Sequence, residues 1–215
     1  MSVKSRIIIP AAALALFGGI GTAGALTANA ATTACGSPCT DFYNADLTGS
    51  FMLSAPTQVA GAGQPIEMFP AGGIGSEDFE ASLQGLVSDF VAAGLMNPGL
   101  GALYGSLSVY EIQWAPGGSP SGFCVGVPGT PRSGTPVTLQ PCGVTAATAW
   151  IYDPVTTKNG SFDALINGAA DRDFKHPASL TAALTGNVST APLKVDKLAK
   201  GKANDQLWGM ITGAL

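Results

Sequence analysis

The chain has 215 residues, of which 46% are hydrophobic and only 11% charged, and it carries a formal net charge of −4. This length predicts a single domain with a hydrophobic core, and the 29 glycines and 15 prolines are typical of a turn-rich, mostly β protein. The acidic balance excludes the basic surface on which binding to nucleic acid or anionic lipid depends, so we expect neither partner.

Residues 1–30 have the pattern of a cleaved secretory signal peptide. Lys4 and Arg6 form a basic start, residues 7–26 are apolar, and an Ala-x-Ala cleavage site ends at residue 30. A membrane anchor would need about 20 consecutive apolar residues, and glycines thin this run, so cleavage is favoured over anchoring. Loss of two basic residues, from 10 basic and 14 acidic, changes the net charge from −4 to −6. We expect residues 31–215 to be secreted and extracellular, without membrane attachment.

Four cysteines in a secreted chain indicate two disulfide bonds, for which three pairings exist. Cys35 and Cys39 flank a Gly-Ser-Pro turn in the N-terminal segment 31–41, and Cys124 and Cys142 bracket the middle of the chain. Pairing within each of these two pairs is the simplest arrangement. The alternative is metal binding, which the single histidine and the lack of a second close cysteine pair disfavour. We therefore expect no metal.

One short motif recurs three times along the chain. In each copy a proline is followed by an aliphatic residue, any residue and a second aliphatic residue, and an apolar strand start lies 12 or 13 residues before the proline. Each copy later reaches a tryptophan. The prolines are Pro65, Pro136 and Pro192, the strand starts are Met52, Cys124 and Leu180, and the tryptophans are Trp114, Trp150 and Trp208. Recurrence in a fixed order predicts a fold built from repeats.

These motifs resemble the ricin B-type β-trefoil lectins. The resemblance lies in the unit from Cys124 through Gly-Thr-Pro-Val to Cys142 and Trp150, and in Gln206-Leu207-Trp208. It covers residues 42–215 and implies an all-β fold, a β-trefoil of three repeats at about 42–114, 115–160 and 161–215. It also implies a Cys124–Cys142 disulfide within the middle repeat. The chain would be a degenerate, secreted bacterial member of that family.

The first repeat contains a predicted helical insertion at about 73–106. Ser76 can cap a helix, and acidic residues follow in the first turn, where they complement the helix dipole. Apolar residues then recur at spacings of three and four, as on one face of a helix. They are Phe79, Leu83, Leu86, Val87, Phe90 and Val91. We predict a helix over 76–93 that packs its apolar face on the barrel, the alternative being a lid or a helix that binds a protein partner.

Signs of catalysis are scarce. His176 is the only histidine, it precedes a proline, and no Gly-x-Ser-x-Gly elbow is present to partner it. Acidic residues for glycoside hydrolysis are candidates by residue type alone, and phosphate-binding and cofactor motifs are absent. We predict a binding protein that is not an enzyme and uses no cofactor.

A sugar site needs an acceptor carboxylate, an amide and an aromatic platform, because sugars offer hydroxyl donors and an apolar face. In the resembled family an Asp lies shortly after the first Cys position, and none of the three repeats of this chain keeps it. The third repeat keeps Asn204, Asp205, Gln206 and Trp208, which we predict to bind a glycan or polysaccharide. A structural role in the core is nevertheless favoured for Gln206 and Trp208.

Two functions therefore stay open. The first is a secreted, lectin-like carbohydrate-binding protein. An exposed aromatic residue beside an acid or amide, outside the core positions, would favour it, and the tyrosines to inspect are Tyr43, Tyr104, Tyr110 and Tyr152. The alternative is a non-enzymatic scaffold that has lost its sugar sites and binds a protein partner, as an inhibitor or surface component, through the helix at 76–93.

Overall fold

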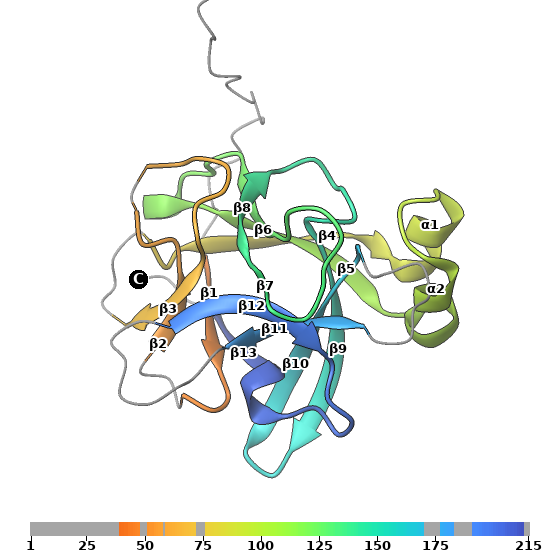
Figure 1. Cartoon of the computed structure of the whole chain (residues 1–215). Helices are drawn as coiled ribbons and strands as arrows, with labels where there is room; N and C mark the ends of the chain where they lie inside the picture. The colour runs from red at the N-terminus through yellow and green to blue at the C-terminus, as the bar shows by residue number, and fades with distance from the viewer. Residues whose placement is uncertain are drawn as a thin grey trace, which may run out of the picture.

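The computed structural model describes residues 39–47, 51–57, 59–71, 76–169, 177–182 and 191–212. The predicted signal peptide, Cys35 and His176 lie outside these ranges. The described residues form a mainly β structure (Figure 1). Its elements are β1 (Thr40–Asn44), β2 (Phe51–Ser54), β3 (Glu67–Pro70), β4 (Phe79–Leu86), α1 (Val87–Ala92), α2 (Pro98–Tyr104), β5 (Ser108–Trp114), η1 (Pro116–Gly118), β6 (Phe123–Gly126), β7 (Thr135–Pro136), β8 (Thr138–Pro141), β9 (Ala149–Thr157), β10 (Gly160–Asn167), β11 (Ala178–Ala182), β12 (Ala191–Lys197), η2 (Asn204–Gln206) and β13 (Leu207–Thr212). The predicted all-β class is confirmed.

Six strands form a closed barrel. The pairing runs from β1 to β4, β5, β9, β10 and β13, and β13 returns to pair with β1. All these pairs are antiparallel. Closure leaves the barrel without unpaired edges, and the alternation of side chains directs one face of every strand into a common core.

Three hairpins close one end of this barrel. They are β2–β3, β6–β8 and β11–β12. Each follows a barrel strand whose last residue, Asn44, Trp114 or Asn167, is fully buried. The hairpins meet through a ring of backbone hydrogen bonds, because Ile66 N–H donates to Val137 O (3.1 Å), Val137 N–H to Leu193 O (3.0 Å) and Leu193 N–H to Ile66 O (3.0 Å). This ring is a threefold hub.

The register of the strands shows that the chain consists of three equivalent units. Val125 pairs with Leu139 in the second hairpin, Leu53 with Met68 in the first and Leu180 with Val195 in the third. The recurring proline motif therefore occupies the same place in every unit, as predicted. Two details differ from the prediction. β5 leads into the second hairpin and belongs to the second unit, so the first does not extend to residue 114, and Leu180 is the equivalent of Val125 where Cys124 was expected.

The register also reassigns one tryptophan. Thr40 pairs with Phe79, Tyr110 with Trp150 and Asp163 with Trp208, so Phe79 is the equivalent of Trp150 and Trp208. Trp114 lies directly opposite Phe79, whereas Asn167 lies opposite Trp150 and Asn44 opposite Trp208. In the second and third units a Trp lies opposite an Asn. At the equivalent pair of the first unit, Phe79 stands at the Trp position and Trp114 stands at the Asn position.

The predicted helix over 76–93 is wrong for most of its length. Residues 79–86 form strand β4, which pairs with β5 as far as Leu86 opposite Ser108, and only residues 87–92 are helical. The apolar spacing was read with a helical period, but Leu83 is 61% exposed and Leu86 41% exposed. Pairing along the barrel outweighed the local signal, and Gly85, at a φ of +143°, lies at the irregularity in the ladder.

The helical insertion is the pair α1 and α2, which lie side by side at one edge of the molecule (Figure 1). Asn97 caps α2, its side chain accepting a hydrogen bond from Gly99 N–H (2.8 Å), and Pro98 follows at the first helical position. The helices bury a second cluster against outward-facing residues of β5, β9 and β10. This cluster contains Val87, Phe90, Met96, Leu100, Val109, Ala149, Ile151 and Ile166. The expectation that the insertion packs on the barrel holds for these helices.

A disulfide joins Cys124 in β6 to Cys142 beyond β8, with 5.0 Å between the Cα atoms. The bond predicted for the middle repeat is confirmed. Cys39 is also disulfide-bonded, and Cys35, its predicted partner, lies outside the described residues.

Candidate functional site

The residues predicted to bind sugar in the third repeat have different surroundings. Gln206 is buried, and its side-chain amide donates hydrogen bonds to Lys197 O (3.0 Å) and Thr181 Oγ1 (3.2 Å), while Gln206 Oε1 accepts one from Ala199 N–H (2.8 Å). Trp208 is fully buried and donates from Nε1 to Leu180 O (3.0 Å). These two side chains use their polar atoms within the protein and support the turn from beneath.

Asn204 and Asp205 face outward from the same turn. Asn204 is exposed and Asp205 is half-buried. The side-chain amide of Asn44 donates to the backbone oxygen of Asp205 (3.0 Å), which fixes the position of the turn. Burial raises the pKa of the Asp205 carboxyl, and the neighbouring carboxylate of Asp46 raises it further. The pair presents an amide and a carboxyl on consecutive residues of a hydrogen-bonded turn.

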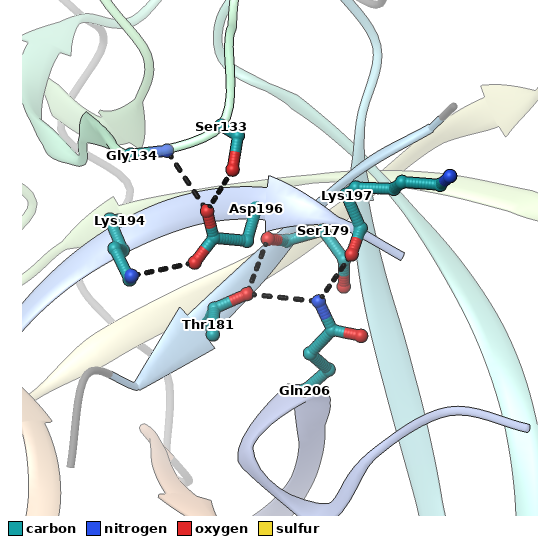
Figure 2. A network of polar contacts seen from close by, with 8 residues as sticks. All are labelled: Ser133, Gly134, Ser179, Thr181, Lys194, Asp196, Lys197 and Gln206. Carbon is teal, nitrogen blue, oxygen red and sulfur yellow. Dashed lines mark hydrogen bonds and ion pairs between the residues drawn. The ribbon is translucent and has the colours of Figure 1, made fainter. Parts of the chain in front are cut away.

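A polar network next to this turn joins the second repeat to the third (Figure 2). Asp196 Oδ1 accepts hydrogen bonds from Ser133 Oγ (2.5 Å) and Gly134 N–H (2.9 Å), and Asp196 Oδ2 forms an ion pair with Lys194 Nζ (2.7 Å). Burial acts to raise the pKa of Asp196, but the hydrogen bonds from Lys194 and Ser133 outweigh it, so the pKa is lowered. Both carboxylate oxygens are engaged internally, which makes Asp196 a link between repeats.

The four tyrosines differ in how they could serve as an aromatic platform. Tyr43 packs edge-on against Phe162, with ring centroids 6.2 Å apart, and Tyr104 packs on the second hydrophobic cluster. Tyr110 and Tyr152 contact each other, with ring centroids 4.2 Å apart and an interplanar angle of 33°. Burial and the nearby carboxyl of Asp163 raise the pKa of Tyr152. Tyr110, Tyr152 and Asp163 therefore combine aromatic rings with a carboxyl, but Tyr152 is buried in the main core and Tyr110 packs against it, so they are not the exposed aromatic residue outside the core that was sought.

Both tyrosines were candidates from the sequence, but Asp163 was not, because nothing local distinguishes this residue from any other aspartate in a strand. The strand register shows where Asp163 lies. Asp163 is the equivalent of Tyr110 and Thr40 in the other units, a position whose side chain points into the barrel, and it pairs with Trp208 of β13. An alignment of the three repeats in which Phe79 is equivalent to Trp150 would have placed Asp163 at the position of Tyr110.

The described residues offer no group of three or more His, Cys, Asp and Glu side chains suited to a metal ion. Three acidic residues, Asp41, Glu77 and Asp78, do influence one another where β1 meets β4. Burial, and then the charges of Asp78 and Glu77, raise the pKa of Asp41 from 3.8 to about 6. In the described ranges, no helix has both the length and the apolar character needed to span a membrane.

No family model and no curated protein matches this chain. Solved structures do. The designed 3-fold symmetric protein ThreeFoil has a TM-score of 0.55 and 12% identity, over 80% of this chain and 96% of its own. A mosquitocidal holotoxin has a TM-score of 0.54 and 11% identity, over 81% of this chain but only 17% of its own.

The Haemophilus ducreyi cytolethal distending toxin is similar with a TM-score of 0.51 and 9% identity, over 84% of this chain and 86% of its own. These likenesses agree with the closed barrel, the three hairpins and the threefold hub. The fold is a β-trefoil. At such identities the likeness concerns the architecture alone, and a β-trefoil does not by itself imply a function.

Proposed function

We propose that this β-trefoil is a secreted, non-enzymatic carbohydrate-binding protein of the ricin B lectin type, and that its sugar site is the turn of the third repeat at Asn204 and Asp205. The observation that carries the proposal is the outward-facing carboxyl–amide pair on a turn fixed by Asn44 and Gln206. A carboxylate accepts hydrogen bonds from sugar hydroxyls, and an amide both donates and accepts.

Rigidity of this turn supports the proposal. Gln206 connects it to β11 and β12, and Trp208 anchors the strand that follows. Since the backbone that carries Asn204 and Asp205 is held in place before a sugar arrives, little backbone conformational entropy would be lost on binding. The confirmed disulfide agrees with secretion, because disulfide bonds persist in oxidising compartments.

Binding of a protein partner is the second candidate, and one observation favours it. The helical insertion and the strand leading into it expose large apolar side chains, namely Leu83, Leu86, Leu95 and Leu103. Exposed apolar side chains gathered on one segment are a feature of interaction surfaces.

The test of the first candidate is glycan binding by the oxidised chain. Soluble sugars are titrated by calorimetry, and insoluble polysaccharides are used in pull-down assays. We expect saturable binding to one glycan class, weakened by Asn204→Ala and by Asp205→Asn but unchanged by Asp89→Asn, a matched acidic position exposed on α1. Circular dichroism confirms that each variant is folded. Absence of binding across the panel, or binding that survives both third-repeat changes, would contradict the proposed site.

A further inference from the structure

We propose that the open end of the barrel binds a primary ammonium group, held by Asp163, Tyr152 and Tyr110. This site is separate from the turn at Asn204 and Asp205 and does not depend on the glycan proposal. It rests on where the barrel is open, on a buried hydroxyl without a partner and on the charges around it.

The two ends of the barrel differ in their exposure. At the hairpin end, Asn44, Trp114 and Asn167 are fully buried. At the other end, inward-facing positions of β4, β9 and β13 include Leu83, Pro154 and Thr212, and all three are exposed. The rim of the barrel at this second end is therefore in contact with solvent.

Three side chains of this open end lie on neighbouring strands. Tyr110 pairs with Trp150, two residues from Tyr152 in β9, and Tyr152 pairs with Leu165, two residues from Asp163 in β10. Tyr152 is thus a diagonal neighbour of both Tyr110 and Asp163, within reach of long side chains on one face of a sheet. The contact between the two tyrosine rings and the electrostatic influence of Asp163 on Tyr152 agree with this placement.

The hydroxyl group of Tyr152 is buried without a hydrogen-bond partner among the described residues. Tyr152 as a whole is 7% exposed. Buried hydroxyl groups are normally satisfied, so this hydroxyl, near the half-buried carboxyl of Asp163, is free to form one hydrogen bond, as acceptor or donor, with a group from outside the chain, either a water molecule or a ligand. Met210, 39% exposed, occupies the equivalent of the Tyr152 position in β13 and adds an apolar edge.

The charges favour a cation over a neutral or anionic group. Lys202 forms an ion pair with Asp153 (2.7 Å), so its charge is largely neutralised there and Asp163 supplies the excess negative charge. Burial, and then the charge of Asp153, raise the pKa of Asp163, while Lys202 lowers it. An ammonium group has three N–H donors, which suit the Asp163 carboxylate and the Tyr152 oxygen, and the face of Tyr110 attracts a cation.

The test is a titration of the oxidised, isotope-labelled chain with n-butylammonium, followed by ¹H–¹⁵N NMR at constant ionic strength. Neutral n-butanol is the matched control ligand. We expect saturable shifts at residues 110, 152 and 163 with the amine and none with the alcohol. Asp163→Asn should weaken binding by about tenfold or more, the loss expected for one hydrogen bond to a charged group. Asp89→Asn should leave it unchanged.

A second variant protects the test against misfolding. Tyr152→Phe removes only the hydroxyl and should also weaken amine binding, so it replaces Asp163→Asn if that variant loses its dispersed spectrum. A blocked lysine, Nα-acetyl-lysine amide, shows whether the site also accepts a lysine side chain. Absence of saturable shifts, equal shifts with n-butanol, or binding unchanged in the folded variants would overturn the proposal. None of these outcomes bears on Asn204 and Asp205.

Discussion

Two tryptophans of the core should differ in how much they contribute to stability, although both are fully buried. Trp208 donates a hydrogen bond from Nε1 to Leu180 O (3.0 Å), whereas the Nε1 of Trp114 has no hydrogen-bond partner in the described structure. Replacement by Phe removes ring volume at either position. Only at Trp208 does it also leave a buried carbonyl oxygen without its indole donor.

The expected magnitudes follow from these contacts. Loss of ring volume in a packed core costs about 1–2 kcal/mol at each site. Loss of the Trp208 hydrogen bond adds about 1–3 kcal/mol, because the acceptor stays buried. Trp114→Phe removes an unsatisfied donor and gains a little in return. Trp208→Phe should therefore destabilise the protein by about 1–3 kcal/mol more than Trp114→Phe.

Urea denaturation of the oxidised protein, followed by circular dichroism, measures this difference. Equal slopes of the unfolding free energy against urea for both variants would show that the denatured state is unaffected. Equal losses of stability for the two replacements, or a larger loss for Trp114→Phe, would refute the reasoning from hydrogen bonds.

Three more predictions follow from the same structure. Cys124→Ser with Cys142→Ser should lower the free energy of unfolding by about 3 kcal/mol, the chain-entropy value for a loop of 18 residues, as measured by urea denaturation. Asp41 has a folded-state pKa raised from 3.8 to about 6, so the folded state binds the proton more tightly and stability should fall as the pH rises through this window. Asp41→Asn should remove that slope in denaturation series across the window, with a gain of about 1–2 kcal/mol at neutral pH after solvent screening of a half-exposed group. Phe79→Trp alone should overpack the core by about 1–3 kcal/mol, and a double-mutant cycle with Trp114→Asn should show favourable coupling, because the pair then matches Trp208 and Asn44.

The parts of the fold that could be predicted from the sequence are those marked by a recurring motif, by alternation of apolar residues or by closely spaced cysteines. The proline motif could be read at Pro65, Pro136 and Pro192 because the threefold hub needs the same extended, aliphatic segment in every unit. Alternation made β5 visible, and the two cysteines of the middle repeat were close enough to suggest their bond. In each case the signal lay in short stretches of sequence, either alone or repeated along the chain.

The helix prediction failed for the opposite reason. Residues 79–86 contain apolar residues that suit a helix face and a strand face equally well, so periodicity alone could not decide between them. The deciding factor was the pairing with β5, on the far side of the two helices, which no local pattern records. The helix α2 begins at Asn97-Pro98, beyond the predicted end at residue 93, because Asn97 caps it and Pro98 suits the first helical position.

The candidate sites were only partly predictable. Asn204 and Asp205 were found because they stand beside a recognisable Gln-x-Trp motif, and the burial of Gln206 and Trp208 agrees with the structural role already favoured for them. Asp163 could not be found from the sequence, because its significance depends on Tyr152 of the neighbouring strand β9 and on Tyr110 of β5, the strand beyond β9.

The threefold geometry explains why ligand sites should arise at some positions and not at others. At the hub, the backbone hydrogen bonds of Ile66, Val137 and Leu193 run in a closed ring, so each residue meets the other two and a polar or oversized side chain in one repeat would disturb all three. At the open end the equivalent positions are Thr40, Tyr110 and Asp163, which share neither size nor polarity. Tyr110 and Asp163 are only partly buried, although Thr40 is buried, and the three side chains do not have to match one another. Divergence between repeats is therefore tolerated where the barrel opens, and that is where a carboxyl group and an aromatic pair could come together without loss of the core.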